Sequence, residues 1–149
     1  MQVPEHIPHD AVLYRHAFYD RMYDEYEDLV FNKMFEFRSS NQHCESTVWG
    51  KYASIDRVHE LGCSKERADQ AEGKRNIYTG AIWATAGGVR RVENSKGHRL
   101  VVRHAPDEGV QHAHICYDTS RGVPKGGVKW ELYAKLEKEF SDLLPHRCS

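Results

Sequence analysis

The residue types most suited to chemistry gather on two neighbouring segments of the chain. Arg99 and Arg103 lie on the first segment, and His112 and His114 lie on the second. Imidazoles titrate near neutral pH, so two histidines can act as general acid and base, while arginine offers paired donors to phosphate or carboxylate. These four residues therefore predict a surface that binds an anion or, in a catalytic version, cleaves a phosphodiester.

The His112 and His114 pair could also chelate a transition metal if a third ligand came from elsewhere, with Cys116, Asp118 and His59 as the candidates. On the expected strand pairing, however, a guanidinium lies beside the imidazoles, and a positive charge disfavours a neighbouring cation. We therefore expect no metal and no other resident cofactor. A solvated polar sheet face is the plainest alternative to an anion site.

A β-hairpin must position these residues. Segments 99–105 and 110–117 are rich in strand-forming residues, and 106–109 (Pro-Asp-Glu-Gly) suits a four-residue turn. In that register Arg103 faces His112, and the arginines and histidines share one face. The opposite face collects apolar residues, which we expect to be buried: Leu100, Val102, Ala113, Ile115 and Tyr117.

The spacing of apolar residues predicts further elements on either side of this hairpin. The expected helices cover residues 11–29, 54–71, 86–94 and 128–144. The expected strands outside the hairpin cover residues 35–38, 46–52 and Ile77–Thr85. The order α-ββ-α-β-α-ββ-α predicts an α+β fold, with a mainly antiparallel sheet of two hairpins plus a central strand, and with helices packed on one side.

Two of the expected helices have distinctive faces. The last helix carries one apolar stripe, formed by Val128, Leu132, Leu136 and Phe140. The first helix is rich in tyrosine, which is typical of a core edge or an oligomer interface. We therefore expect a homo-oligomer, most simply a dimer, formed through the first helix or through an exposed sheet edge.

The composition indicates a single domain covering residues 1–149. Hydrophobic residues make up 40% and charged residues 29%, which are globular values and argue against disorder. The formal net charge of −1 argues against a general nucleic-acid binder, although a local basic patch would still permit one. No apolar run reaches the length of a membrane span, and no leader pattern opens the chain.

The four cysteines, Cys44, Cys63, Cys116 and Cys148, are widely spaced and form no C-x-x-C pair. In a chain of this size with no leader pattern, reduced thiols are the simpler interpretation. We therefore expect all four to be free and the protein to be cytoplasmic.

Two stretches of the chain resemble a known group of proteins. They are STVWGKYASIDRVHELGC at 46–63 and GHRLVVRHAPDEGVQHAHICY at 97–117. Both are similar to small uncharacterised bacterial proteins of the kind encoded by mobile integron gene cassettes. The resemblance runs from residue 46 to the last helix, and the N-terminal segment departs from it. It implies a bacterial cytoplasmic origin and an accessory role, and it assigns no catalytic residue.

Two functions of different classes agree with these residues. The first is a non-catalytic binding module for a small anionic ligand or a protein partner. The alternative is a small hydrolase or nuclease that uses the histidine and arginine face. A concave, water-accessible pocket holding at least two of the four residues would favour the enzyme, and an open face would favour the binding module.

Overall fold

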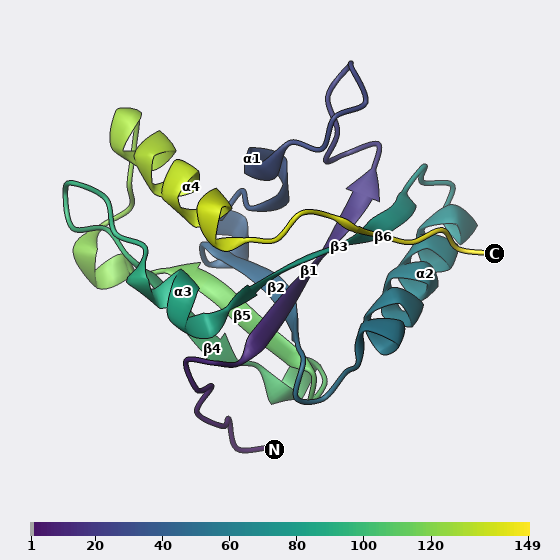
Figure 1. Ribbon diagram of the computed structural model, residues 1–149, viewed down its shortest axis with the longest axis horizontal. Helices are drawn as coiled ribbons and strands as arrows, with labels where there is room; N and C mark the ends of the chain where they lie inside the picture. Colours follow the sequence, from purple (N-terminus) through teal and green to yellow (C-terminus); the bar gives the residue numbers. More distant parts are fainter. Residues whose placement is uncertain (1) are drawn as a thin grey trace.

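A six-stranded antiparallel sheet runs through the molecule, with its strands in the order β4-β5-β2-β1-β3-β6 (Figure 1). The structure, a computed structural model, describes residues 2–149. Its strands are β1 (Val12–Tyr19), β2 (Cys44–Trp49), β3 (Ile77–Thr85), β4 (Leu100–His104), β5 (His112–Tyr117) and β6 (Leu144–Pro145). Its helices are α1 (Phe31–Met34), α2 (Ile55–Ala71), α3 (Ala86–Arg91) and α4 (Gly127–Glu139). This architecture confirms an α+β fold with a mainly antiparallel sheet.

The predicted order of elements is wrong, because the described chain reads β-α-β-α-β-α-β-β-α-β. The main error is the first helix, since β1 occupies the start of segment 11–29. Leu13 and Ala17 are fully buried in the core on one face of β1, and Tyr14 and His16 contact the α2 side on the other. A strand covered on both faces does not alternate between apolar and polar residues, and its apolar spacing imitated that of a helix.

The first predicted hairpin is also wrong. Segment 35–38 is irregular, and β2 pairs with β1 and β5 instead. Phe35 and Phe37 are buried in the core, while Glu36 and Arg38 form an ion pair outside it. Phe37 adopts a φ of 49°, in the left-handed region, which interrupts an extended strand. The alternation of apolar and charged residues in segment 35–38 therefore comes from an irregular connection whose two phenylalanines are buried, and not from a strand.

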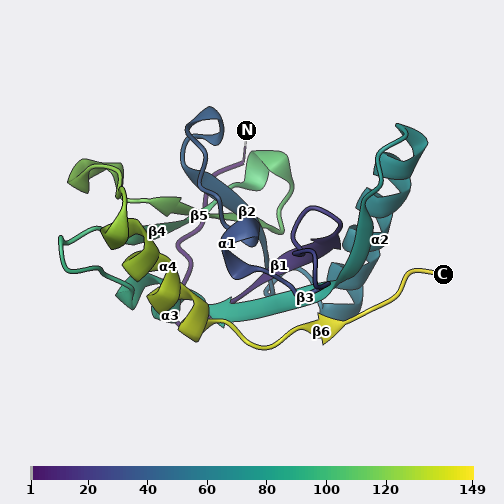
Figure 2. The same cartoon turned by 90° about the horizontal axis from the view of Figure 1, so that it is seen from above.

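Helices cover both faces of the sheet, whereas the sequence predicted helices on one side. Val48 and Trp49 are consecutive in β2, so their side chains point to opposite faces. Val48 packs in a cluster with Val58 of α2, and Trp49 belongs to the larger core that contains Leu136 of α4. Figure 2 shows α2 and α4 at opposite ends of the molecule. Within residues 2–149, no helix is both long and apolar enough to cross a membrane.

The hairpin of β4 and β5 exists, but its register is shifted by two residues from the prediction. Arg103 lies opposite His114 rather than His112. A 3-10 turn at Pro106–Glu108 lengthens the connection between the strands. Because the shift is even, every side chain stays on its predicted face. Leu100, Ala113, Ile115 and Tyr117 are buried as predicted, and Val102 is half-buried.

The C-terminal helix is confirmed, although it ends earlier than predicted. Leu132 and Leu136 are buried, in agreement with the apolar stripe. The helix α4 stops at Glu139, and Phe140 is extended. The chain then returns to the sheet as β6, where Leu144 pairs with Ala81 of β3. The sheet edge therefore captures residues that the local pattern assigned to the helix.

All four cysteines are paired, which corrects the expectation of free thiols. Cys44 bonds Cys116 across β2 and β5, and Cys63 of α2 bonds Cys148 near the C-terminus. The partners are 72 and 85 residues apart in sequence. Wide spacing in sequence therefore did not exclude pairing, because the fold brings the distant segments together.

Candidate functional site

We call the surface formed by Arg99, Arg103, His112 and His114 the cationic face. Arg103 and His114 are direct neighbours across β4 and β5, and His112 lies one step further along the same face. Arg103 is exposed, and Arg99 lies just before β4. The structure therefore brings three of the four predicted residues together, with Arg99 at the border.

Carboxylates already occupy part of this face. His114 Nε2 lies 2.7 Å from Glu108 Oε2, and Arg99 Nε lies 3.6 Å from Glu93 Oε1. His112 Nδ1 is 3.3 Å from the hydroxyl of Ser46. Burial lowers the pKa of His112, and the nearby His114 adds to this effect while Glu108 opposes it. With the pKa of His112 lowered and His114 in contact with Glu108, Arg103 is the main cation of this face available to an anion.

A second basic site lies between α2 and residues 146–149, which we call the C-terminal tail. The two segments enclose a hollow of about 640 Å³, the tail hollow. Its charged and titratable lining residues are Asp56, Arg57, His59, Glu60 and Arg67 of α2, with His146 and Arg147 of the tail. None of these residues belongs to the cationic face.

Among residues 2–149, two arginines of the tail hollow have no carboxylate partner. Arg57 forms an ion pair with Glu60 at 3.0 Å. Arg67 donates only to the Ser64 hydroxyl, at 3.1 Å, and Arg147 makes no side-chain hydrogen bond or ion pair with any other residue of the described range 2–149. The guanidinium groups of Arg67 and Arg147 therefore remain available for an anion.

Two imidazoles line the same hollow as these arginines. His59 and His146 stack with ring centres 4.2 Å apart and planes 10° from parallel. His59 Nδ1 lies 2.8 Å from the hydroxyl of Tyr78. Burial and the adjacent His146 both lower the pKa of His59, because a charge on one ring disfavours a charge on the other. A bound anion would offset this repulsion.

The tail is held in place by covalent and backbone bonds. The Cys63–Cys148 disulfide joins it to α2, and the backbone N–H of His146 donates to Thr79 of β3 at 3.0 Å. The hollow is therefore bounded on both sides by anchored elements.

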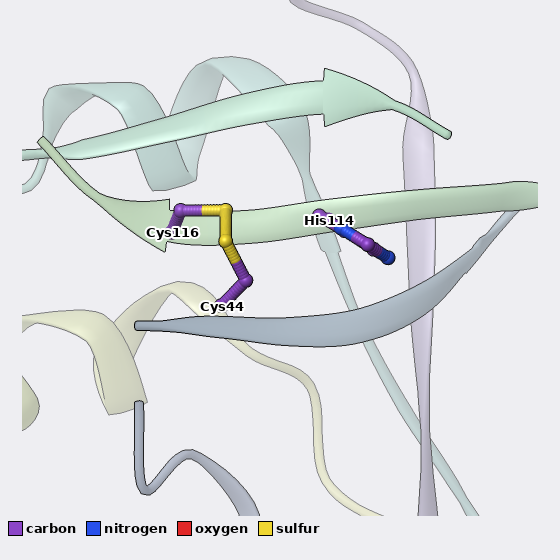
Figure 3. A group of neighbouring side chains, drawn as sticks. All are labelled: Cys44, His114 and Cys116. Atoms are coloured by element: carbon purple, nitrogen blue, oxygen red, sulfur yellow. A yellow bond between two sulfur atoms is a disulfide. The ribbon is translucent and has the colours of Figure 1, made fainter. Parts of the chain in front are cut away.

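One more group of side chains has the chemistry of metal ligands. Cys44, His114 and Cys116 place a sulfur, a ring nitrogen and a sulfur within 4.8 Å of one another. Figure 3 shows the disulfide between Cys44 and Cys116, with His114 beside it on β5. While the disulfide is intact, its sulfurs are not thiolates and hold no metal strongly.

Sequence reasoning missed most of the tail hollow. The sequence pointed to His59 only as a candidate third metal ligand, and to none of Arg67, His146 and Arg147. His59 and His146 are 87 positions apart, so no local spacing links them. The sequence places His146 and Arg147 directly before Cys148. This would have indicated a site beside α2 only if the pairing of Cys148 with Cys63 had been known.

Comparison with protein-family models, with curated proteins and with solved structures finds no match to this chain. The functional argument therefore depends on the geometry of the sites themselves.

Proposed function

We propose that the protein is a non-catalytic binding module for a small anionic ligand, and that the tail hollow is its anion site. The observation that carries this proposal is the pair of guanidinium groups without carboxylate partners, Arg67 and Arg147, beside the stacked imidazoles of His59 and His146. Guanidinium groups bind phosphate and carboxylate through paired hydrogen bonds. A hollow of about 640 Å³ lies within the usual range for a small-molecule site.

The stacked histidines make anion binding depend on pH. An anion in the hollow favours protonation of His59, whose pKa is otherwise lowered by burial and by His146. Binding is therefore coupled to proton uptake by His59, and the affinity for an anion of fixed charge rises as the pH falls.

Titration calorimetry with inorganic phosphate tests the proposal. The pH dependence is measured with sulfate, which keeps both negative charges between about pH 6 and about pH 8, and we expect it to bind more tightly at the lower pH because His59 is then more protonated. The Arg147→Gln variant should weaken binding by about tenfold or more, the usual effect of losing a hydrogen bond from a charged donor.

The matched control is Arg103→Gln, which removes an exposed arginine from the cationic face instead. It should leave phosphate affinity unchanged. The opposite pattern, in which only Arg103→Gln weakens binding, would move the site to the cationic face. Absence of phosphate binding at both pH values would contradict the anion site altogether.

The alternative function is a small hydrolase or nuclease centred on the cationic face. It is favoured by the 2.7 Å contact between His114 and Glu108, because a carboxylate can orient an imidazole for proton transfer. His112 beside the Ser46 hydroxyl supplies a second titratable group. Turnover of a phosphodiester that is lost in His114→Ala would support this alternative over the binding module.

We further propose that the protein binds a protein partner, most simply a second copy of itself. Segment 11–29 holds β1 rather than the predicted tyrosine-rich helix, which leaves a sheet edge, β4 or β6, as the route to a homodimer. If the homodimer forms, the mass measured in solution should exceed the 17.3 kDa of one chain. The resemblance to integron cassette proteins supports an accessory bacterial role.

The compartment is a separate part of the proposal. The expectation of a cytoplasmic protein depended on free thiols, and both cysteine pairs are instead disulfides. Cytosolic reductants keep most thiols reduced, so two disulfides favour an oxidising compartment. We propose that the protein is active where these bonds persist, and labelling of its thiols in intact cells tests this.

A further inference from the structure

The Cys44–Cys116 disulfide lies beside a histidine that is placed to complete a metal site. Cys44 and Cys116 are direct cross-strand partners in β2 and β5. His114 precedes Cys116 by two residues, so its side chain projects from the same face of the sheet. The sulfurs and one imidazole nitrogen lie within 4.8 Å of one another (Figure 3).

We propose that reduction of this disulfide converts Cys44, Cys116 and His114 into a binding site for a thiophilic metal ion, with Zn²⁺ as the best fit. Two thiolates and one imidazole form a ligand set that zinc uses in proteins. Separation of the sulfurs is required, because each must lie about 2.3 Å from a shared zinc ion. Breaking the S–S bond permits that separation.

The conversion has two balanced steps. A dithiol reductant transfers two electrons and two protons to the disulfide, which yields two thiols and the cyclic disulfide of the reductant. Zinc then binds the two sulfurs and releases both protons to solvent. The disulfide and the metal therefore exclude each other, and the redox state of Cys44 and Cys116 selects between them.

Glu108 acts as a positioning residue in this site. Its carboxylate oxygen Oε2 lies 2.7 Å from His114 Nε2, so Nδ1 is the ring nitrogen left for the metal. Metal-bound histidines commonly donate their other nitrogen to a carboxylate, which sets the orientation of the ring and its tautomer. The side chain of His114 is 26% exposed while both cysteines are buried, so an ion can enter from the histidine side.

The charges of the loaded site answer the objection that an arginine beside the histidines disfavours a metal ion. Arg103 faces His114 across the hairpin, and a guanidinium disfavours a bare divalent cation. Two thiolates neutralise Zn²⁺, however, so the loaded site adds no positive charge beside Arg103.

Metal titration of the full chain tests the proposal. The oxidised protein should not bind Co²⁺ or Zn²⁺ at this site. After reduction with a dithiol and its anaerobic removal, Co²⁺ should produce sulfur-to-metal charge-transfer absorption, and Zn²⁺ should displace it. Bound Zn²⁺ should also protect Cys44 and Cys116 from alkylation, as read by mass spectrometry.

Matched variants separate this site from the other cysteine pair. The double variant C63S/C148S should retain the cobalt signal, and C44S/C116S should lose it. Glu108→Gln should weaken zinc affinity by about 10–100-fold, the usual effect of removing such a carboxylate, while leaving the ligands intact. His114→Ala should weaken it further.

Three results would overturn the proposal. The first is a reduced, folded wild-type chain that gives no charge-transfer band. The second is a band that survives in C44S/C116S and disappears in C63S/C148S. The third is a reduced chain that unfolds, as seen by circular dichroism, and is not refolded by Zn²⁺.

Discussion

At the scale of single residues, His16 shows how burial controls a titratable group. Its Nε2–H donates to the carbonyl of Val58 on α2 at 2.8 Å, and its ring packs edge-on against Tyr78. The pKa of His16 is lowered to about 4, mainly by burial between β1 and α2 and also by positive charge on Arg15, His59 or His112, although the bond to Val58 opposes the shift. The neutral imidazole is therefore part of the folded state.

This burial predicts a loss of stability in mild acid. In the unfolded chain His16 has an ordinary pKa of about 6.5, so between about pH 6.5 and about pH 4 the unfolded state binds more protons than the folded state. The free energy of unfolding should therefore fall by about 3 kcal/mol as the pH decreases through that window. Urea unfolding at a series of pH values measures this loss.

The variant His16→Gln should make the pH dependence shallower. Glutamine can still donate to the Val58 carbonyl but does not titrate in this range. His6→Gln, which replaces an exposed histidine, should retain the wild-type slope. Equal slopes for wild type and His16→Gln would show that His16 does not cause the acid sensitivity.

At the scale of elements, α4 covers the core face of the sheet, and α2 covers part of the opposite face. Leu132 and Leu136 of α4 are buried, and neighbouring Lys138 is exposed. After α4 the chain returns to β3 as β6, and this return places the tail beside α2. The position of α4 therefore affects both the core and the tail hollow.

Replacing Leu136 by alanine should lower the free energy of unfolding by about 2–5 kcal/mol, because Leu136 is fully buried and the substitution leaves a cavity. Denaturant unfolding measures the change. Lys138→Ala, two positions further on, should change stability by no more than about 0.5 kcal/mol. Similar losses for both variants would mean that the effect comes from the helix rather than from packing.

At the scale of the whole molecule, the two disulfides link segments that are distant in sequence. One closes β2 on β5, and the other fastens the tail to α2. The separations of 72 and 85 residues mean that each bond greatly restricts the unfolded chain. The bonds therefore stabilise the fold and, at the tail, define the hollow.

Alkylation of denatured, unreduced protein should find no free thiols, whereas prior reduction should reveal all four. Replacing Cys63 and Cys148 by serine should lower the free energy of unfolding by about 2–4 kcal/mol, through the greater freedom of the unfolded chain. The same variant should weaken phosphate binding, because the tail loses its attachment to α2. Four free thiols before reduction would restore the original expectation of reduced cysteines.

The sequence by itself determined those helices, strands and faces that depend only on residues close together in the chain. Strand β3 has its predicted bounds, Ser54 caps α2 by accepting from the Arg57 amide, and Leu132 and Leu136 lie in the core. The cationic and apolar faces of the hairpin also follow from the sequence, because alternation survives an even shift in register. These features depend on residues a few positions apart.

Tertiary structure decided the features that depend on distant partners. The pattern of segment 11–29 predicted a helix where the structure has β1, because this strand is covered on both faces, by α2 on one and by the core on the other. The cysteine pairs, the tail hollow and the contact of His59 with His146 likewise join positions more than 70 residues apart. Periodicity records which side of an element is buried, but it carries no information about which distant segment buries it.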